Sequence, residues 1–173
     1  MDLKTKIRTV PNFPKEGIMF RDVTTLLTDP CALDYAIEQM AKQYIDVVID
    51  KIVGIEARGF IFGALLAKKM DVGFVPIRKK GKLPAETISE TYDLEYGTDT
   101  VEIHKDALKQ GDKVVVADDL VATGGTLLAS IKLLEKVGAN IVGVSCVIDL
   151  PDLGGSKKLE KYKPHFLMSF EGE

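Results

Sequence analysis

Continuous apolar runs alternate along this chain with segments in which apolar residues recur at helical spacing. The runs are short and rich in β-branched residues, which is typical of strands that are covered on both faces of a sheet. They occupy residues 52–55, 72–77, 114–117 and 141–148. The pattern therefore predicts four strands, with the run at 114–117 at the centre of the sheet.

Three helices are predicted before and between these strands. The first begins at Asp29-Pro30, with the Asp as N-cap and the Pro at the first helical position. Its apolar positions are Leu33, Ile37, Met40, Tyr44 and Val47. The second helix follows Arg58-Gly59 and carries Phe60, Leu65 and Leu66. The third carries Leu127, Ile131, Leu134 and Val137, and Gly138 is its expected C-terminal cap.

Strands that alternate with helices predict an α/β fold, a mostly parallel, twisted sheet flanked by helices. With 173 residues the chain is expected to form a single domain over residues 1–173. Residues 79–100 are polar, contain Gly and Pro and lack a clear period, so a loop is expected there. A further strand is expected at 101–104, with Glu102 and His104 facing solvent.

Composition and charge narrow the class of protein. Hydrophobic residues make up 46% and charged residues 28%, and the formal net charge is -3, which argues against broad nucleic-acid binding. Neither a transmembrane-length apolar run nor an N-terminal signal-peptide pattern is present, so a cytoplasmic protein without a membrane partner is expected. Cys31 and Cys146 match no metal or redox spacing and are expected to be two buried free thiols.

The segment 114–126 carries the most specific chemistry. It reads as a β-branched run, two adjacent carboxylates (Asp118 and Asp119), a turn of small residues and a helix start. Backbone N–H groups at the start of a helix, together with the hydroxyls of Thr123 and Thr126, form a phosphate cradle. The order of residues is neither a Walker loop nor a G-x-G-x-x-G motif. The alternative is a strand end with an Asp as N-cap, followed by an ordinary loop. The immediate succession of strand, carboxylates, turn and helix instead favours a phosphorylated sugar as the ligand.

Two groups of cations fit an anionic partner. Arg58 lies where a strand ends and a helix begins, a place where anions gather. Arg78, Lys79, Lys80 and Lys82 place four cations within five residues. A surface salt bridge at Arg58 and a solvated face at 78–82 are the alternatives. Gly81 and Pro84 favour a shaped loop that closes over an anion, with Lys80 facing solvent.

These residues resemble a known family. Residues 114–126 resemble the 5-phosphoribosyl-1-pyrophosphate (PRPP) motif of type I phosphoribosyltransferases. Three further stretches resemble segments of the adenine phosphoribosyltransferases: 13–22 the base-binding segment, 55–60 the pyrophosphate-side loop, and 78–84 with 94–97 the mobile active-site loop. The likeness extends from about residue 5 to 150, and the motifs follow the family's order. The last twenty or so residues carry no such signal.

The resemblance implies the type I phosphoribosyltransferase fold, with a small N-terminal base-binding hood over about residues 1–30 and a mobile active-site loop over about 79–100. It implies purine salvage, in which adenine and PRPP give AMP and pyrophosphate. It further implies a homodimer and Mg²⁺. The metal is expected to bind through PRPP rather than in a cage of protein ligands, because Mg²⁺ keeps waters and substrate phosphates as ligands.

The resemblance also implies a role for each site residue. The residues expected to bind the ribose are Asp118 and Asp119. Those expected to bind the 5-phosphate are Ala122, Thr123, Gly124, Gly125 and Thr126. The residues expected to bind the pyrophosphate are Arg58, Arg78, Lys79 and Lys82. Those expected to bind adenine are Met19, Phe20, Arg21 and Tyr96. Glu95 is the expected proton handler, and Arg58 is expected to assist catalysis separately, by compensating charge in the transition state.

The sequence leaves several alternatives open. Glu95 could be the exposed residue of a turn, Glu102 and His104 compete for its role, and Phe20 could pack in the core. A PRPP-sensing regulator is a different class of function that this fold could serve. The same catalyst acting on another purine is a third possibility.

Overall fold

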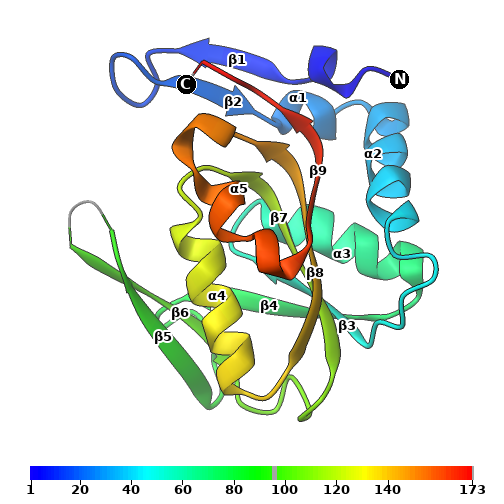
Figure 1. Cartoon of the computed structure of the whole chain (residues 1–173), viewed down its shortest axis with the longest axis vertical. Helices are drawn as coiled ribbons and strands as arrows, with labels where there is room; N and C mark the ends of the chain where they lie inside the picture. The colour runs from blue at the N-terminus through cyan, green and yellow to red at the C-terminus, as the bar shows by residue number, and fades with distance from the viewer. Residues whose placement is uncertain (95–96, 173) are drawn as a thin grey trace.

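The computed structural model of the chain describes residues 1–94 and 97–172, and its centre is a seven-stranded sheet in the order β5-β6-β4-β3-β7-β8-β9. The parallel strands are β4 (Gly73–Lys79), β3 (Lys51–Ile55), β7 (Lys113–Val121), β8 (Asn140–Asp149) and β9 (Pro164–Ser169). The strands β6 (Thr98–His104) and β5 (Thr87–Asp93) continue the sheet in antiparallel pairing (Figure 1). The predicted α/β fold with a mostly parallel sheet is confirmed.

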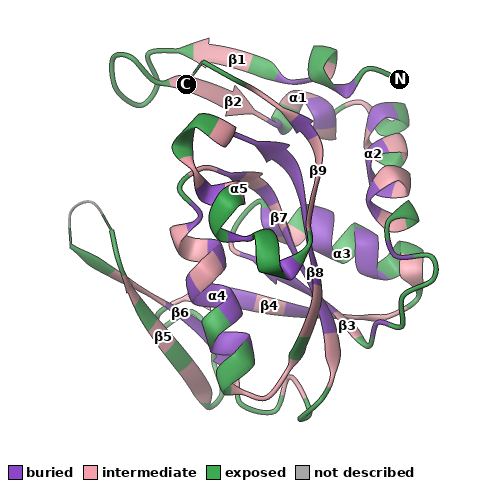
Figure 2. Cartoon of the chain, viewed as in Figure 1, coloured by how far each residue is buried: buried purple, intermediate pink, exposed green. Residues whose placement is uncertain are grey.

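Helices cover the sheet on both faces. Helices α2 (Pro30–Lys42) and α3 (Gly59–Met70) bury one cluster of apolar side chains, which includes Ile52 and Val115. Helix α4 (Gly125–Lys136) buries a second cluster with Val53 and Val116. Neighbouring residues of one strand thus belong to opposite faces, and these residues are buried on both faces. This explains why the central strands read as unbroken apolar runs (Figure 2).

The first long helix begins as predicted and ends earlier. The Asp29 side chain accepts a hydrogen bond from the Ala32 N–H, and Pro30 opens α2. The helix stops at Lys42, so the expected continuation to Val47 is wrong. Tyr44 instead lies buried after a turn and donates its hydroxyl proton to the Val144 carbonyl at 3.2 Å. A side chain at Gly143 would meet the Tyr44 ring at 2.6 Å, so a tertiary contact ends the helix where periodicity alone would continue it.

The N-terminal residues form a separate small layer. It contains the short 3₁₀ helix η1 (Leu3–Lys6), an antiparallel pair of strands, β1 (Arg8–Pro11) and β2 (Met19–Asp22), and the short helix α1 (Thr24–Leu27). Figure 1 shows this layer across one end of the main sheet, next to the last residues of the chain. The Arg21 guanidinium lies 4.4 Å from the centre of the Phe170 ring, just beyond β9. We call the layer, residues 1–28, the hood.

The polar segment 79–100 is more regular than the sequence suggested. Two strands, β5 and β6, occupy most of it and form a hairpin. The prediction of a loop without regular structure is therefore wrong. In β5 the half-buried residues Ile88, Glu90 and Tyr92 alternate with exposed ones. A period of two was therefore present, but it is short, and the charged Glu90 separates the apolar Ile88 from Tyr92. The mobility of this segment stays a prediction.

Two smaller expectations are also corrected. Glu102 does not face solvent: it is 8% exposed, because its strand lies inside the sheet, and its Oε2 accepts a hydrogen bond from the Gly81 N–H at 2.9 Å. Its neighbour on the same face, His104, is half-buried, with Nε2 enclosed. Both cysteines are free, but only Cys146 is buried, whereas Cys31 is exposed in the first turn of α2. Among the described residues, no helix is both long and apolar enough to cross a membrane.

Candidate active site

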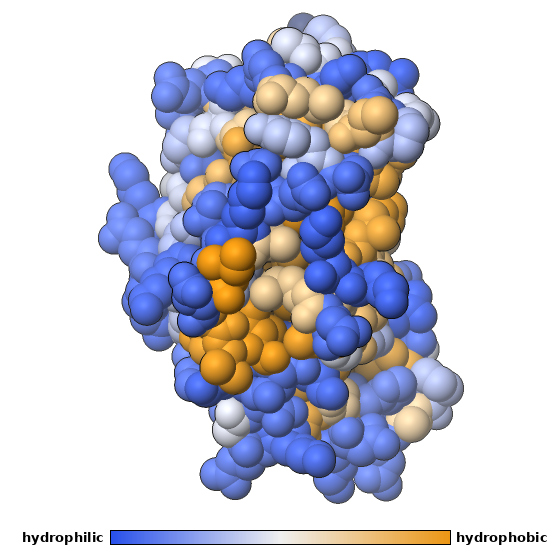
Figure 3. Space-filling model, turned by 90° about the vertical axis from the view of Figure 1, so that its right-hand side faces the viewer, coloured by the Kyte–Doolittle hydropathy of each residue, from blue (hydrophilic) through white to orange (hydrophobic). Residues whose placement is uncertain are grey.

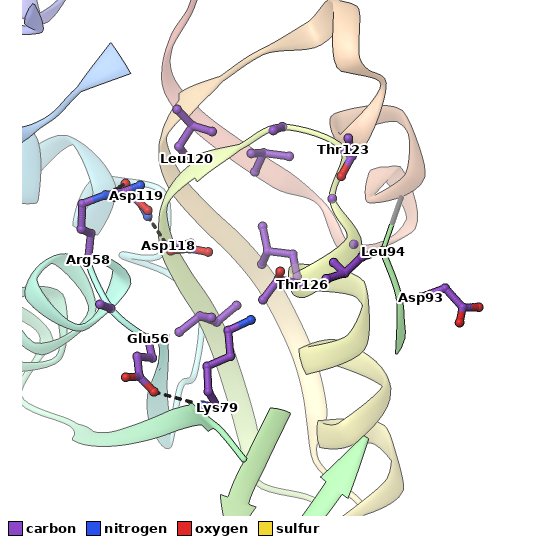
Figure 4. Close-up of a pocket in the computed structure, with 17 residues that line it drawn as sticks. Glu56, Arg58, Lys79, Asp93, Leu94, Asp118, Asp119, Leu120, Thr123 and Thr126 are labelled. Carbon is purple, nitrogen blue, oxygen red and sulfur yellow. Dashed lines mark hydrogen bonds and ion pairs between the residues drawn. The ribbon is translucent and has the colours of Figure 1, made fainter. Parts of the chain in front are cut away.

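Residues of three of the sequence motifs, 55–58, Lys79 and 118–126, line one cavity of about 770 Å³. The cavity lies beyond the carboxyl ends of β3 and β7, where helices α3 and α4 begin (Figures 1 and 4). Loops at this edge of a parallel sheet are the usual ligand site in α/β folds. The hairpin reaches the same cavity through Asp93 and Leu94.

The phosphate turn, which we define as residues 122–126, lines one wall of the cavity. Strand β7 continues through the two carboxylates to Val121, and α4 begins at Gly125. Gly124 has a φ of +77°, a backbone conformation that side chains disfavour. The turn thus delivers the first free N–H groups of α4 to the cavity, as an anion site requires.

The paired carboxylates do different things, as expected for neighbours on an extended strand. Asp118 accepts a hydrogen bond from the Asp119 N–H at 2.9 Å, and a side chain at Gly59 would come within 2.6 Å of its Oδ1. Burial and the charge of Asp119 raise the pKa of Asp118 well above its usual range. Asp119 is turned the other way and forms an ion pair with Arg58. A cation brought close to Asp118 would therefore favour its ionised form.

Arg58 connects the cavity with the hood. It occupies the N-cap position of α3, and its Nε donates to Asp119 Oδ2. Its guanidinium carbon lies 5.7 Å from the centre of the Phe20 ring on β2. Burial lowers the pKa of Arg58, but the charge and hydrogen bond of Asp119 raise it by more. Arg58 is thus a fixed cation between the hood and the strand end.

Glu56 is the site residue that the sequence reasoning missed. It directly follows β3, and its carboxylate accepts hydrogen bonds from Lys82 Nζ at 2.7 Å and from Arg78 Nη2 at 3.2 Å. It also accepts the Lys79 N–H at 3.0 Å, which Figure 4 draws. Burial raises its pKa, but the hydrogen bonds from Lys82 and Arg78 outweigh this and lower it to about 2. Its signal was a carboxylate two residues before Arg58, at the end of a predicted strand.

The predicted pyrophosphate cations are all near the cavity but not equivalent. Lys79 lines it directly, and its Nζ contacts Asp99 and the Tyr92 hydroxyl, the latter at 3.0 Å. The Tyr92 hydroxyl is in turn 3.0 Å from Thr126 Oγ1, so the hairpin touches the phosphate turn. The cationic groups of Arg78 and Lys82 instead form ion pairs with the Glu56 carboxylate. Lys80 is exposed, as expected.

The predicted adenine residues lie in the hood. Met19, Phe20 and Arg21 form the half-buried strand β2. Phe20 packs edge-on against Phe13, with ring centres 5.1 Å apart, and faces Arg58. The described lining of the cavity includes none of the three, and Phe20 is linked to it through Arg58, which lines the cavity. Glu95 and Tyr96 lie outside the described residues.

Comparison with known proteins identifies this arrangement. A family model for the phosphoribosyl transferase domain matches residues 25–170. An adenine phosphoribosyltransferase of Desulfosudis oleivorans is 60% identical over 173 residues, which are 100% of each chain. The crystal structure of adenine phosphoribosyltransferase from Thermoanaerobacter pseudethanolicus is 51% identical, with a TM-score of 0.94 over 98% of each chain. The chain belongs to the adenine phosphoribosyltransferase family.

Membership of the adenine phosphoribosyltransferase family confirms the resemblance and the type I fold, and it makes the chain a transferase rather than a PRPP-sensing regulator. A more distant member, from Saccharomyces cerevisiae, was crystallised with adenine and an imino-altritol bisphosphate. It is 40% identical, with a TM-score of 0.91 over 96% of this chain and 97% of its own. The roles of individual residues rest on the geometry above and remain predictions.

The low pKa of Glu56 predicts how stability depends on pH. A carboxylate whose pKa is lower in the folded than in the unfolded protein stabilises the fold at any pH above its unfolded-state pKa. This contribution is lost as the pH falls through the folded-state pKa. Glu56→Gln should therefore lower the free energy of unfolding by about 1–3 kcal/mol at about pH 7. The difference from wild type should shrink between pH 4.5, the ordinary value, and about 2. Urea unfolding at several pH values measures it.

Glu86→Gln is the matched control, because Glu86 is 84% exposed and pairs with Lys105 only at 3.5 Å. This variant should unfold like wild type at every pH. An equal loss for Glu56→Gln at about pH 7 and near pH 2 would show that packing, not ionisation, is responsible.

Proposed function

We propose that this chain transfers the 5-phosphoribosyl group of PRPP to N9 of adenine, giving AMP and pyrophosphate in purine salvage. The observation that carries the proposal is the single cavity, which brings together the phosphate turn, two carboxylates and the cations Arg58 and Lys79. Such a set fits a sugar with phosphates at both ends. The identity of the base is supported by the relatives, one of which was crystallised with adenine.

The proposed reaction requires both anionic and cationic groups in the site. When the bond from ribose C1 to pyrophosphate breaks, positive charge develops on the sugar and negative charge on the leaving group. Asp118 and Asp119 bind the ribose hydroxyls and present anions to the sugar, and the phosphate turn holds the 5-phosphate. Arg58 and Lys79 compensate the leaving group, joined by Arg78 and Lys82 when these leave Glu56.

Mg²⁺ is proposed as the cofactor. No three His, Cys, Asp or Glu side chains of the described residues are grouped so that they could hold a metal ion. The acidic strand end still fits Mg²⁺, which binds proteins through one or two carboxylates and completes its shell with waters and substrate phosphates. Bound through PRPP, it would supply charge compensation for the pyrophosphate.

The base is proposed to bind between the hood and the cavity. Main-chain groups of Met19 and Arg21 would read the adenine edge, with Phe20 against the ring and Tyr96 over it. Glu95 would accept the proton that N9 loses or hold the base at N7. Asp93 and Leu94, which precede it, line the cavity and support this placement. We also propose a cytoplasmic location, which free Cys31 and Cys146 fit.

An activity assay across purine bases tests the proposed reaction. Purified protein with adenine, PRPP and Mg²⁺ should form AMP and release pyrophosphate in equal amounts. Chromatography of the nucleotides and a coupled pyrophosphate assay measure both products. Turnover with hypoxanthine or xanthine but not with adenine would overturn the choice of base, whereas tight PRPP binding without any turnover would overturn catalysis.

Two substitutions separate the proposed catalytic roles. Glu95→Gln keeps the shape of the side chain and should lower kcat by about 10²-fold or more, with little change in PRPP affinity. Arg58→Ala removes a cation from the leaving group and should lower kcat/KM by about 10²-fold. Lys80→Ala, in the same basic run but exposed, is the control and should behave like wild type. Near-normal turnover of Glu95→Gln would remove it as the proton handler.

We propose that the chain works as a homodimer. Figure 3 shows apolar side chains gathered on the side of the molecule where α2 and α3 lie. The large apolar residues that α3 exposes are Ile61 and Leu65, one helical turn apart, and the segment after α2 exposes Ile45 and Val48. Exposed apolar surface of this kind is typical of a protein interface.

The dimer is tested by light scattering after size exclusion. Wild type should elute with twice the mass of the chain, and Ile61→Lys with Leu65→Lys should shift it to the monomer. Leu153→Lys, at an exposed site outside these segments, should leave the dimer intact. A dimer that survives the double substitution would place the interface elsewhere, and a wild-type monomer would overturn the proposal.

A further inference from the structure

The phosphate turn is held from behind by a part of the chain that the sequence motifs do not reach. Helix α5 (Gly155–Lys158) lies against the turn, following the short 3₁₀ helix η2 (Pro151–Leu153). The Gly155 N–H donates to the Ala122 carbonyl at 3.0 Å, and Lys158 Nζ donates to the Thr123 carbonyl at 2.9 Å. Two successive carbonyl groups of the turn are thus bound on the α5 side.

The contact at Gly155 is backbone against backbone. A Cβ at this buried position would lie 2.3 Å from the Ala122 carbonyl oxygen and 2.7 Å from the Gly124 nitrogen. Neither atom is the end of a flexible side chain that could turn away, so a side chain at 155 must change the packing of the turn against α5. Glycine is needed here for close approach.

The two carbonyl contacts determine where the N–H groups of the turn point. In a trans peptide the C=O and the N–H of one unit point in opposite directions. The carbonyls of Ala122 and Thr123 share their peptide units with the N–H groups of Thr123 and Gly124. Because both carbonyls accept hydrogen bonds from the α5 side, both N–H groups must point away from those donors. Thr123 and Gly124, which carry them, line the cavity. Successive N–H groups aimed the same way form an anion-binding concavity.

Helix α5 is itself anchored in the core. Leu159, its first following residue, is fully buried, and the Tyr162 hydroxyl donates to Glu135 of α4 at 3.0 Å. The chain before it is tied to the end of β7, where the Leu150 N–H donates to the Val121 carbonyl at 2.9 Å. The turn is therefore clamped between β7, α4 and α5.

We propose that Gly155 and Lys158 are positioning residues for the 5-phosphate: they hold the phosphate turn in the orientation that presents its N–H groups to the ligand. The inference rests on the proposed function, in which this turn binds the 5-phosphate of PRPP. Lys158 acts through the Thr123 carbonyl and Gly155 through close backbone contact, so neither touches the substrate. The role explains why the C-terminal segment matters to a site that otherwise ends at residue 126.

Kinetics and binding of variants test the proposal. Lys158→Met should raise the KM for PRPP and the Kd of ribose 5-phosphate about 3–10-fold, the effect of one hydrogen bond. Gly155→Ala should raise both by about tenfold or more. The KM for adenine should stay within about twofold of wild type, a split that general destabilisation would not produce. Lys158→Arg should restore much of the affinity, because it keeps a donor and a charge.

Lys157→Met is the matched control, because it removes the same charge from an exposed position of the same helix. Titration calorimetry with ribose 5-phosphate gives the Kd, and thermal unfolding checks each variant. If Gly155→Ala does not fold, the comparison of Lys158→Met, Lys158→Arg and Lys157→Met decides. Lys158→Met that binds ribose 5-phosphate like Lys157→Met, in an enzyme that makes AMP, would overturn the positioning role alone. If wild type makes no AMP but Lys158→Met still weakens ribose 5-phosphate binding, the reaction fails and the positioning role stands.

Discussion

The ion pair between Arg58 and Asp119 is the contact on which the site depends most. It joins the start of α3 to the end of β7, and its guanidinium also faces Phe20 of the hood. Asp119 is only 8% exposed on its side chain, so removal of Arg58 would leave a buried charge without its partner. The same residue therefore has a structural and a chemical reason to be Arg: a planar group that satisfies a carboxylate on one edge and keeps charge available on the other.

The rest of the site follows the same rule of local charge balance. In the described part of the chain, the head groups of Arg78 and Lys82 meet on Glu56, and Lys79 meets Asp99. Several cations in a small volume repel one another, and interleaved carboxylates hold them close at a lower cost. In the proposed reaction, pyrophosphate would compete with Glu56 for Arg78 and Lys82. Under this proposal, binding would exchange one anionic partner for another, which would favour a ligand with more negative charge than a single carboxylate.

Sequence reasoning found the parts whose signal is local. The strand at 114–117, the helix start at Asp29-Pro30 and the glycine end of α4 at Gly138 each depend on neighbours in the chain, and each was confirmed. Helix α2 ends early because Tyr44 packs at Gly143, about a hundred residues away. The hairpin was missed because the alternation in β5 is short and the charged Glu90 interrupts its apolar face. Glu56 was missed because only folding brings Lys82 and Arg78 to it.

The phosphate turn shows the limit of a motif most clearly. Its Thr-Gly-Gly-Thr sequence permits the conformation, since Gly124 tolerates a positive φ, but it does not select that conformation among the others open to glycine. Selection comes from contacts outside the motif: Tyr92 on Thr126, Lys158 on the Thr123 carbonyl, and Gly155 against the backbone. Flexible residues can approach a phosphate closely only where the surrounding fold removes their freedom beforehand. A phosphate motif therefore functions together with the segments that pack behind it, and those segments carry their own sequence requirements.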